Sequence, residues 1–190
     1  MADVSGKGVP AALFMALSRT VLRANSLVPR SAREAVSEAN ILIAEDAKSG
    51  MFVTLFYAVA DPGKKTLTYV NAGGHNPPLL FRAGGGRPTG GLKGTGIILG
   101  GVMPEADYGE ETLHLESGDL VLFYTDGVTE AINPPGEEQF GGETRLIETV
   151  TGCLDRPAAE IVERIRDAVV AFSGDEPQFD DLTLMVLRVV

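Results

Sequence analysis

Cysteine, clustered basic residues and long apolar runs are scarce in this sequence, and each shortage argues against a class of protein. The one cysteine, Cys153, cannot form an internal disulfide, which favours a reducing, cytoplasmic setting. The chain has 16 basic against 26 acidic residues and a net charge of -10, so a nucleic-acid backbone or an anionic membrane surface would repel it. It shows no basic-then-apolar leader and no run of about 18 apolar residues. We therefore expect no nucleic-acid partner, no membrane association and no secretion.

The remaining composition is that of a globular domain. Hydrophobic residues make up 44% and charged residues 22% of the 190 residues, which is ordinary usage for a folded chain of this length. We predict a single domain spanning residues 1–190. The acidic excess has two interpretations, because it keeps a surface soluble and it also suits a site that gathers divalent cations.

Local spacing predicts helices in both the first and the last third of the chain. Pro10 suits the first turn of a helix that continues to Asn25. Ser31 and Glu34 have the spacing of a capping box, which predicts the start of a second helix. Two more helices are expected, near residues 143–150 and over residues 157–172.

Strands are expected over residues 51–60, 66–70, 77–82, 111–117, 119–125 and 182–190. The first two would form a hairpin, and the segments 111–117 and 119–125 would form another through Gly118. The glycine-rich residues 84–101 are predicted to be a long loop. This order of elements predicts an α+β fold with antiparallel sheet, because a nucleotide-binding fold would alternate strand and helix strictly.

The opening stretch "DVSGKGVPAALF" has two interpretations. Residues 6–11 fit the loose form of a dinucleotide-binding loop, G-x-G-x-x-A. Such a loop needs a strand before it and, about 20 positions later, an acidic residue at the end of a second strand. We expect no strand before Gly6, because the chain starts two residues before Asp3, and residues 26–45 are predicted as loop and helix. We therefore favour Asp3 as the functional residue, with glycines that let the backbone approach closely.

Other aspartates stand at the ends of predicted strands. Asp126 directly follows the apolar run "LVLFYT", and Asp180 and Asp181 directly precede "LTLMV". Each of these residues by itself could be a turn former. Together with Asp3 they would supply the oxygen ligands that a hard divalent cation needs, if the strands are neighbours. The sequence therefore favours a metal site at the strand ends.

Five motifs in order carry a resemblance to a known family: "DVSGKGVPAAL", "NAGGHNPPLL", "GDLVLFYTDGVTEA", "QFG" and "FDDLTLMVLRV". The chain is similar, over essentially its whole length, to the metal-dependent PPM-type protein serine/threonine phosphatases of the bacterial SpoIIE/RsbU branch. The resemblance implies an antiparallel β-sandwich flanked by helices on both faces, in four layers, with a centre of two Mn²⁺ or Mg²⁺ ions. It also implies a phosphorylated protein substrate, often an anti-anti-sigma factor of the STAS type.

The resemblance carries roles onto particular residues. It implies metal ligation by the side chains of Asp3, Asp126 and Asp180 and by the backbone carbonyl of Val4, which makes the three aspartates the candidate catalytic residues. It gives Gly127 and Asp181 a supporting role next to the ligands. His75 has two interpretations, a general base or a residue that orders its loop through a hydrogen bond, and we favour the second.

A metal-activated water would then hydrolyse the phosphoester, because two cations bridged by that water lower its pKa and offset charge on the phosphoryl oxygens. Neither Cys153 nor Ser5 is needed as a nucleophile. Metal-bound water is our expectation for the proton donor to the leaving group.

The sequence departs from the family pattern at its beginning. Family members usually have a further stretch before the first motif, with a β-hairpin and another acidic ligand, so we expect the first hairpin to be missing and one metal to be weakly held. An open sheet edge would favour a homodimer or an aggregation-prone monomer. The alternative function is a weak or inactive domain of the same fold that binds a regulatory partner.

Overall fold

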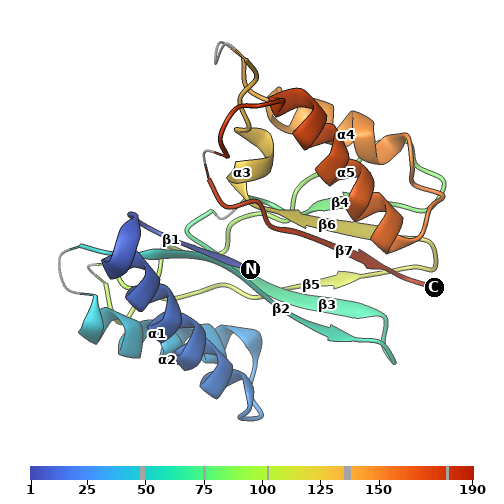
Figure 1. The fold of residues 1–190 in the computed structure, drawn as a ribbon. Helices are drawn as coiled ribbons and strands as arrows, with labels where there is room; N and C mark the ends of the chain where they lie inside the picture. The colour runs from blue at the N-terminus through green and yellow to red at the C-terminus, as the bar shows by residue number, and fades with distance from the viewer. Residues whose placement is uncertain (48–49, 75, 102, 135–137, 179) are drawn as a thin grey trace. The chain divides into compact units, whose positions relative to one another are not determined.

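Seven strands and five helices make up a computed structural model that describes residues 1–47, 50–74, 76–101, 103–134, 138–178 and 180–190 (Figure 1). The elements belong to two compact units. The first unit is Met1–Pro77 with Lys93–Leu115, and the second is Pro78–Leu92 with Glu116–Val190. The single domain over residues 1–190 stays a prediction, and each unit is described by itself.

The first unit is built on a four-stranded antiparallel sheet with the order β1-β2-β3-β5. Its strands are β1 (Ala2–Val4), β2 (Val53–Asp61), β3 (Thr66–Ala72) and β5 (Glu111–His114). Two helices, α1 (Gly8–Ser26) and α2 (Ala32–Asp46), cover one face of this sheet (Figure 1). The core between helices and sheet contains Phe14, Val36, Ile43, Val53, Leu55, Val70, Leu99 and Tyr108.

Both helices of the first unit follow the local signals. Helix α1 contains Pro10 in its first turn, where the missing N–H costs no hydrogen bond. Helix α2 starts with the predicted capping box, since the Glu34 amide donates to the Ser31 hydroxyl and the Ser31 amide donates to the Glu34 carboxylate. The predicted hairpin of β2 and β3 is confirmed as well.

The second unit contains a three-stranded antiparallel sheet with the order β4-β6-β7. Its strands are β4 (Leu79–Phe81), β6 (Leu120–Tyr124) and β7 (Leu184–Arg188), and its helices are α3 (Asp126–Thr129), α4 (Gly142–Thr151) and α5 (Ala158–Ser173). The core of this unit contains Phe81, Leu120, Leu122, Tyr124, Phe140, Leu146, Ile161 and Ile165. Every residue of the central strand β6 is buried.

The second predicted hairpin is wrong. Strand β5 pairs with β3 in the first unit, whereas β6 pairs with β4 and β7 in the second. Between them, the Asp119 carboxylate accepts the Glu116 amide at 2.8 Å, and the Gly118 amide donates to the Val189 carbonyl at 2.8 Å. These contacts turn the chain toward β7 instead of back along β5.

The expectation that no strand precedes Gly6 is also wrong, because β1 pairs with β2 at Asp3↔Thr54 and Val4↔Val53. The dinucleotide interpretation still fails, since that pairing is antiparallel and a Rossmann unit requires parallel strands. The predicted loop over residues 84–101 is confirmed, with isolated bridges such as Val53↔Leu99 as its only sheet pairing among the described residues.

The α+β class with antiparallel sheets is confirmed. Among the helices that the structure describes, none combines the length and apolar character needed to cross a membrane.

Candidate metal centre

Asp126 lies where β6 ends and α3 begins. Strand β6 stops at Tyr124, and the Thr125 carbonyl accepts the Val128 amide at 3.1 Å as the helix starts. The carboxylate of Asp126 accepts the amide of Gly127 at 3.0 Å. Asp126 itself is partly buried. A short helix placed directly after an apolar strand therefore presents this carboxylate at the end of the sheet.

Asp180 and Asp181 occupy the turn that leads into β7. The Asp180 carboxylate accepts the Asp181 amide at 2.8 Å, and the Asp180 carbonyl accepts the Gln178 side-chain amide at 2.8 Å. Asp180 is partly buried and Asp181 is exposed. The hydrogen bond to its neighbour's amide holds the Asp180 side chain against its own turn.

The fold of the second unit brings these two segments together. A Cβ atom on Gly127 would lie 2.5 Å from the Asp181 carbonyl oxygen and 3.1 Å from that of Asp180, so only glycine permits this approach. The Thr125 hydroxyl donates to the Asp181 carbonyl at 2.8 Å. Asp126, Gly127, Asp180 and Asp181 therefore share one end of the β4-β6-β7 sheet.

Asp3 and Val4 belong to the first unit, on the short strand β1. Asp3 is exposed, and Val4 is partly buried. The Met1 carbonyl accepts the Phe56 amide of β2 at 2.8 Å, and the Ser5 amide donates at 2.9 Å to the carbonyl of Phe52, the residue before β2. Antiparallel alternation therefore turns the Val4 carbonyl away from the β1–β2 ladder. That orientation suits the ligand role that the resemblance implies for this carbonyl.

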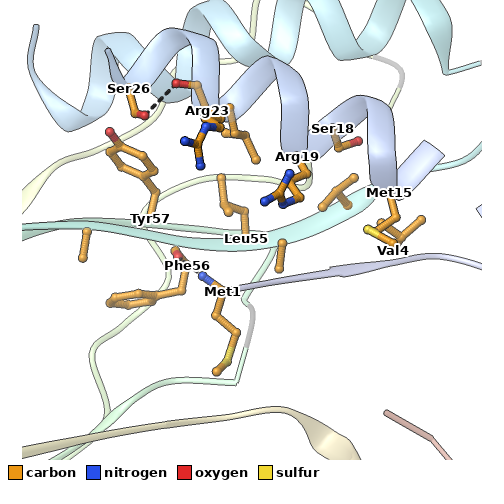
Figure 2. A pocket seen from close by; sticks show the side chains of 14 residues that line it. Met1, Val4, Met15, Ser18, Arg19, Arg23, Ser26, Leu55, Phe56 and Tyr57 are labelled. Carbon is orange, nitrogen blue, oxygen red and sulfur yellow. Dashed lines mark hydrogen bonds between the residues drawn. The ribbon is translucent and has the colours of Figure 1, made fainter. Parts of the chain in front are cut away.

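A pocket of about 490 Å³ in the first unit lies between α1 and the strands β1 and β2 (Figure 2). Val4 and Leu55 contribute to its apolar lining, and Arg19 and Arg23 reach from α1 toward β2. Val4 thus lines a space that separates its strand from a helix. The packing of α1 on β1 is loose at this point.

Two other residues considered from the sequence have different outcomes. His75 lies outside the described residues. Cys153 is buried, its thiol donates to the Thr149 carbonyl at 3.2 Å, and burial raises the pKa of the thiol. A protonated, enclosed thiol is not a nucleophile, in agreement with the expectation that no cysteine chemistry is needed.

The donor chemistry at the end of β6 fits a hard divalent cation, because Asp126 and Asp180 both offer carboxylate oxygens. Within the described parts of the chain, no three Asp, Glu, His or Cys side chains form a ready ligand group. Asp126 and Asp180 would be the residues of the second unit that hold such an ion.

Sequence reasoning missed Thr125. This residue is 5% exposed, and its hydroxyl accepts the Thr183 amide at 2.9 Å as well as donating to Asp181. Its position between a strand and Asp-Gly could have drawn attention, but nothing local in the sequence indicates which segment it contacts.

Comparison with known proteins agrees with this fold. The family model described as Stage II sporulation protein E (SpoIIE) matches residues 1–190. The phosphoserine phosphatase RsbU of Bacillus subtilis (strain 168) is 31% identical over 188 residues, which cover 99% of this chain and 54% of RsbU. The chain spans between about a third and about half of the length of the curated relatives it matches.

Solved structures share the architecture. The SiaA-PP2C domain of Pseudomonas aeruginosa superposes with a TM-score of 0.75 at 21% identity, covering 100% of this chain and 73% of that one. The RsbU and RsbW domains of Rv1364c from Mycobacterium tuberculosis give a TM-score of 0.69 at 26% identity, covering 97% of this chain and 49% of that one. With its fold shared by the SiaA-PP2C domain and its full length matched by the family model, the chain belongs to the SpoIIE family.

Proposed function

We propose that this chain is a metal-dependent protein phosphatase domain that hydrolyses phosphoserine or phosphothreonine on a regulatory protein. The observation that carries the proposal is the approach of the Asp126 and Asp180 segments at the end of β6, fixed by Gly127 and Thr125. Support comes from RsbU, which is named a phosphoserine phosphatase and is 31% identical over 99% of this chain.

Asp126 and Asp180 of the second unit would hold divalent cations. The family resemblance implies the same role for Asp3 and for the Val4 carbonyl, which belong to the first unit. Mn²⁺ or Mg²⁺ suits these oxygen donors, and we expect two ions, one of them held weakly. Such ions, when bound, stabilise negative charge on phosphoryl oxygens and make water a stronger nucleophile at neutral pH.

In this proposal the protein's own residues position the carboxylate ligands and form no covalent bond to the phosphoryl group. In the net reaction water adds to phosphorus, the bond from phosphorus to the serine or threonine oxygen breaks, and that oxygen leaves with a proton as a hydroxyl. Gly127 donates its amide to Asp126, and Asp181 donates its amide to Asp180, so each carboxylate has one oxygen held by its own turn. No side chain of the chain needs to form a covalent intermediate, and the buried Cys153 is unsuited to one.

We further propose a substrate of the anti-anti-sigma, STAS-type class, in the cytoplasm, with a homodimer as a possible assembly. The support is the family relationship, together with the similarity to RsbU and to the RsbU and RsbW domains of Rv1364c. The second candidate function is a partner-binding domain of the same fold with little activity.

Hydrolysis assays separate these two functions. Purified chain is incubated with p-nitrophenyl phosphate and with a phosphoserine peptide, in Mn²⁺ and in excess chelator, alongside Asp126→Asn. Asp167→Asn on α5 is the matched control, because Asp167 is exposed and its carboxylate pairs only with Arg166 among the described residues. Turnover that needs Mn²⁺ and Asp126 supports the phosphatase. Folded protein that never turns over substrate supports the binding domain.

A further inference from the structure

The backbone ladder between β6 and β7 changes at its last step. Tyr124 pairs with Leu184 at the end of the two strands. One residue further, the Thr125 amide still donates to the Thr183 carbonyl at 3.2 Å, so the ladder continues on one side. In a regular antiparallel pair, the Thr183 amide would return a hydrogen bond to the Thr125 carbonyl.

The Thr125 carbonyl is already engaged in starting a helix. It accepts the Val128 amide at 3.1 Å in the first turn of α3, the helix that begins with Asp126. The Thr183 amide donates instead to the Thr125 hydroxyl oxygen, at 2.9 Å. The side chain thus takes the place of the backbone carbonyl and lengthens the ladder by one bond while the main chain turns away.

The same hydroxyl makes a second contact with its hydrogen. It donates to the Asp181 carbonyl at 2.8 Å, so its donor and one of its acceptor sites are both used in a buried position. Asp126 follows Thr125 directly, and Asp180 precedes Asp181 directly. One hydroxyl therefore links the two segments that carry the candidate ligands. Asp126 is adjacent to the residue that donates this hydrogen bond, and Asp180 is adjacent to the residue that accepts it.

Gly127 limits how the two segments can relax. Its Cα approaches the Asp181 carbonyl so closely that a Cβ would lie 2.5 Å from the oxygen. The Thr125 hydroxyl binds the backbone of residues 181 and 183 close to the end of β6. Gly127 permits this close approach because it has no side chain. Neither contact involves the Asp126 or Asp180 carboxylates themselves, which stay available to bind cations.

We propose that the Thr125 hydroxyl is a positioning group that holds residues 180–183 in register with the end of β6 and thereby sets the separation of the Asp126 and Asp180 carboxylates. The consequence for metal binding rests on the proposed function. The register itself does not, because it is a property of the protein without metal. Serine supplies the same hydroxyl, whereas valine has nearly the same shape without it.

The test compares Thr125→Val and Thr125→Ser with the unaltered protein and with Thr149→Val. Thr149 is a matched control, because its hydroxyl also donates to a backbone carbonyl at 2.8 Å in the same unit, within α4 and away from the two aspartates. Amide hydrogen exchange in metal-free protein reports the register at Thr183. Calorimetric titration with Mn²⁺ reports the ligand geometry, and circular dichroism confirms folding.

We expect Thr125→Val to accelerate exchange of the Thr183 amide by about tenfold and to weaken Mn²⁺ binding by about tenfold, as loss of a buried hydrogen-bonding group predicts. Thr125→Ser should stay within roughly threefold of the unaltered protein in both measurements, and Thr149→Val should change neither.

Unaltered exchange at Thr183 in Thr125→Val would overturn the proposal. Faster exchange with unaltered Mn²⁺ affinity would also overturn it, because the hydroxyl would then be only structural. If the unaltered protein binds no Mn²⁺, the proposed function fails, and the exchange comparison still decides whether the hydroxyl holds the register.

Discussion

The two units hold their candidate ligands in opposite ways. In the second unit, Asp126 and Asp180 lie on segments joined by Thr125 and by the close approach at Gly127. In the first unit, Asp3 lies on a three-residue strand with its side chain exposed. One candidate pair is thus built into a local network, whereas the other ligand depends on how a short strand is placed.

The polar network of the first unit lies away from Asp3, at Asn40 of α2. This fully buried side chain donates to the carbonyls of Met103 and Pro104 and accepts the Gly100 amide, each at 2.9 Å. Leu99, the residue before Gly100, exchanges two backbone hydrogen bonds with Val53, which pairs with Val4 on β1. The position of β1 therefore depends on a series of contacts, which we call the relay: Asn40 of α2 holds the loop at Gly100, and the neighbouring Leu99 holds β2, with which β1 pairs. A ligand placed by such a relay is easier to displace than one fixed by its own turn.

The largest effect is expected at the locally fixed ligand. Asp126→Asn removes a ligand charge with almost no change in volume, so hydrolysis should fall on the order of a hundredfold or more while the fold persists. Activity with Mn²⁺ and the midpoint of thermal unfolding, measured together, check this. Asp167→Asn should behave like the unaltered protein. Full turnover by Asp126→Asn would remove this residue from the site.

The next effect concerns the buried ion pair of the second unit. The Asp119 carboxylate is 1% exposed, pairs with the Arg82 guanidinium at 2.6 Å and accepts the amides of Ala83 and Glu116. Asp119→Ala removes the carboxylate that these donors contact and should lower the free energy of unfolding by about 4 kcal/mol in urea titrations. Asp61→Ala in the first unit is the comparison, since the Asp61 carboxylate accepts the Lys64 amide in an exposed turn. Equal losses would contradict the difference between the units.

Asn40 tests the relay in the first unit. Asn40→Ala leaves the Gly100 amide and two carbonyls without this partner, so we expect a loss of about 3 kcal/mol in the free energy of unfolding. Asn25→Ala on α1 is a matched control, because among the described residues the side chain of Asn25 hydrogen-bonds to Val21 and Arg30, both within five positions of it. A smaller loss for Asn40→Ala than for Asn25→Ala would show that the loop is held by other contacts.

Gly127→Ala should cost somewhat less, about 2 kcal/mol, because the added Cβ would meet the Asp181 carbonyl at 2.5 Å and the turn must shift. Mn²⁺ affinity should fall as well, since the same turn carries Asp180. Gly152→Ala is the control, with its nearest atoms at 3.6 Å. Equal unfolding midpoints for the two variants would indicate that the turn at Asp180 can shift away from the added Cβ with no loss of stability.

The smallest effect is a dependence on pH. Burial would raise the pKa of Asp119, but hydrogen bonds from the Glu116 and Ala83 amides and the charge of Arg82 outweigh it and hold that pKa below its usual value. The stability gained from the ionised carboxylate is therefore present above about pH 5 and is lost as the pH falls through about 4 and below. The difference in unfolding free energy between the unaltered protein and Asp119→Asn should shrink as the pH falls below about 4. A constant difference would show that Asp119 does not titrate in this range.

Local signals were sufficient for elements whose stabilising contacts lie close in sequence. The Ser31–Glu34 capping box starts α2, and the turn at residues 61–64 joins β2 to β3. They were insufficient for β1, because three residues are too few to show a strand's alternation, and β1 exists through its pairing with residues more than 45 positions away. The candidate site shows the same division, since the sequence places Asp126 and Asp180 at strand ends but indicates no role for Thr125.

Residue spacing, caps and ordered motifs were enough to predict the spans of the main helices, most strands, the α+β class and the family. Two features could be seen only in the folded protein: the chain leaves one sheet for the other near Gly118, and a threonine hydroxyl replaces a backbone carbonyl at the end of β6. Both depend on hydrogen bonds between segments about 50 or more positions apart, here Gly118 with Val189 and Thr125 with Thr183. A side chain's own sequence neighbourhood holds no information on which distant backbone group will come within 3 Å of it, because that distance is set by packing of the whole unit.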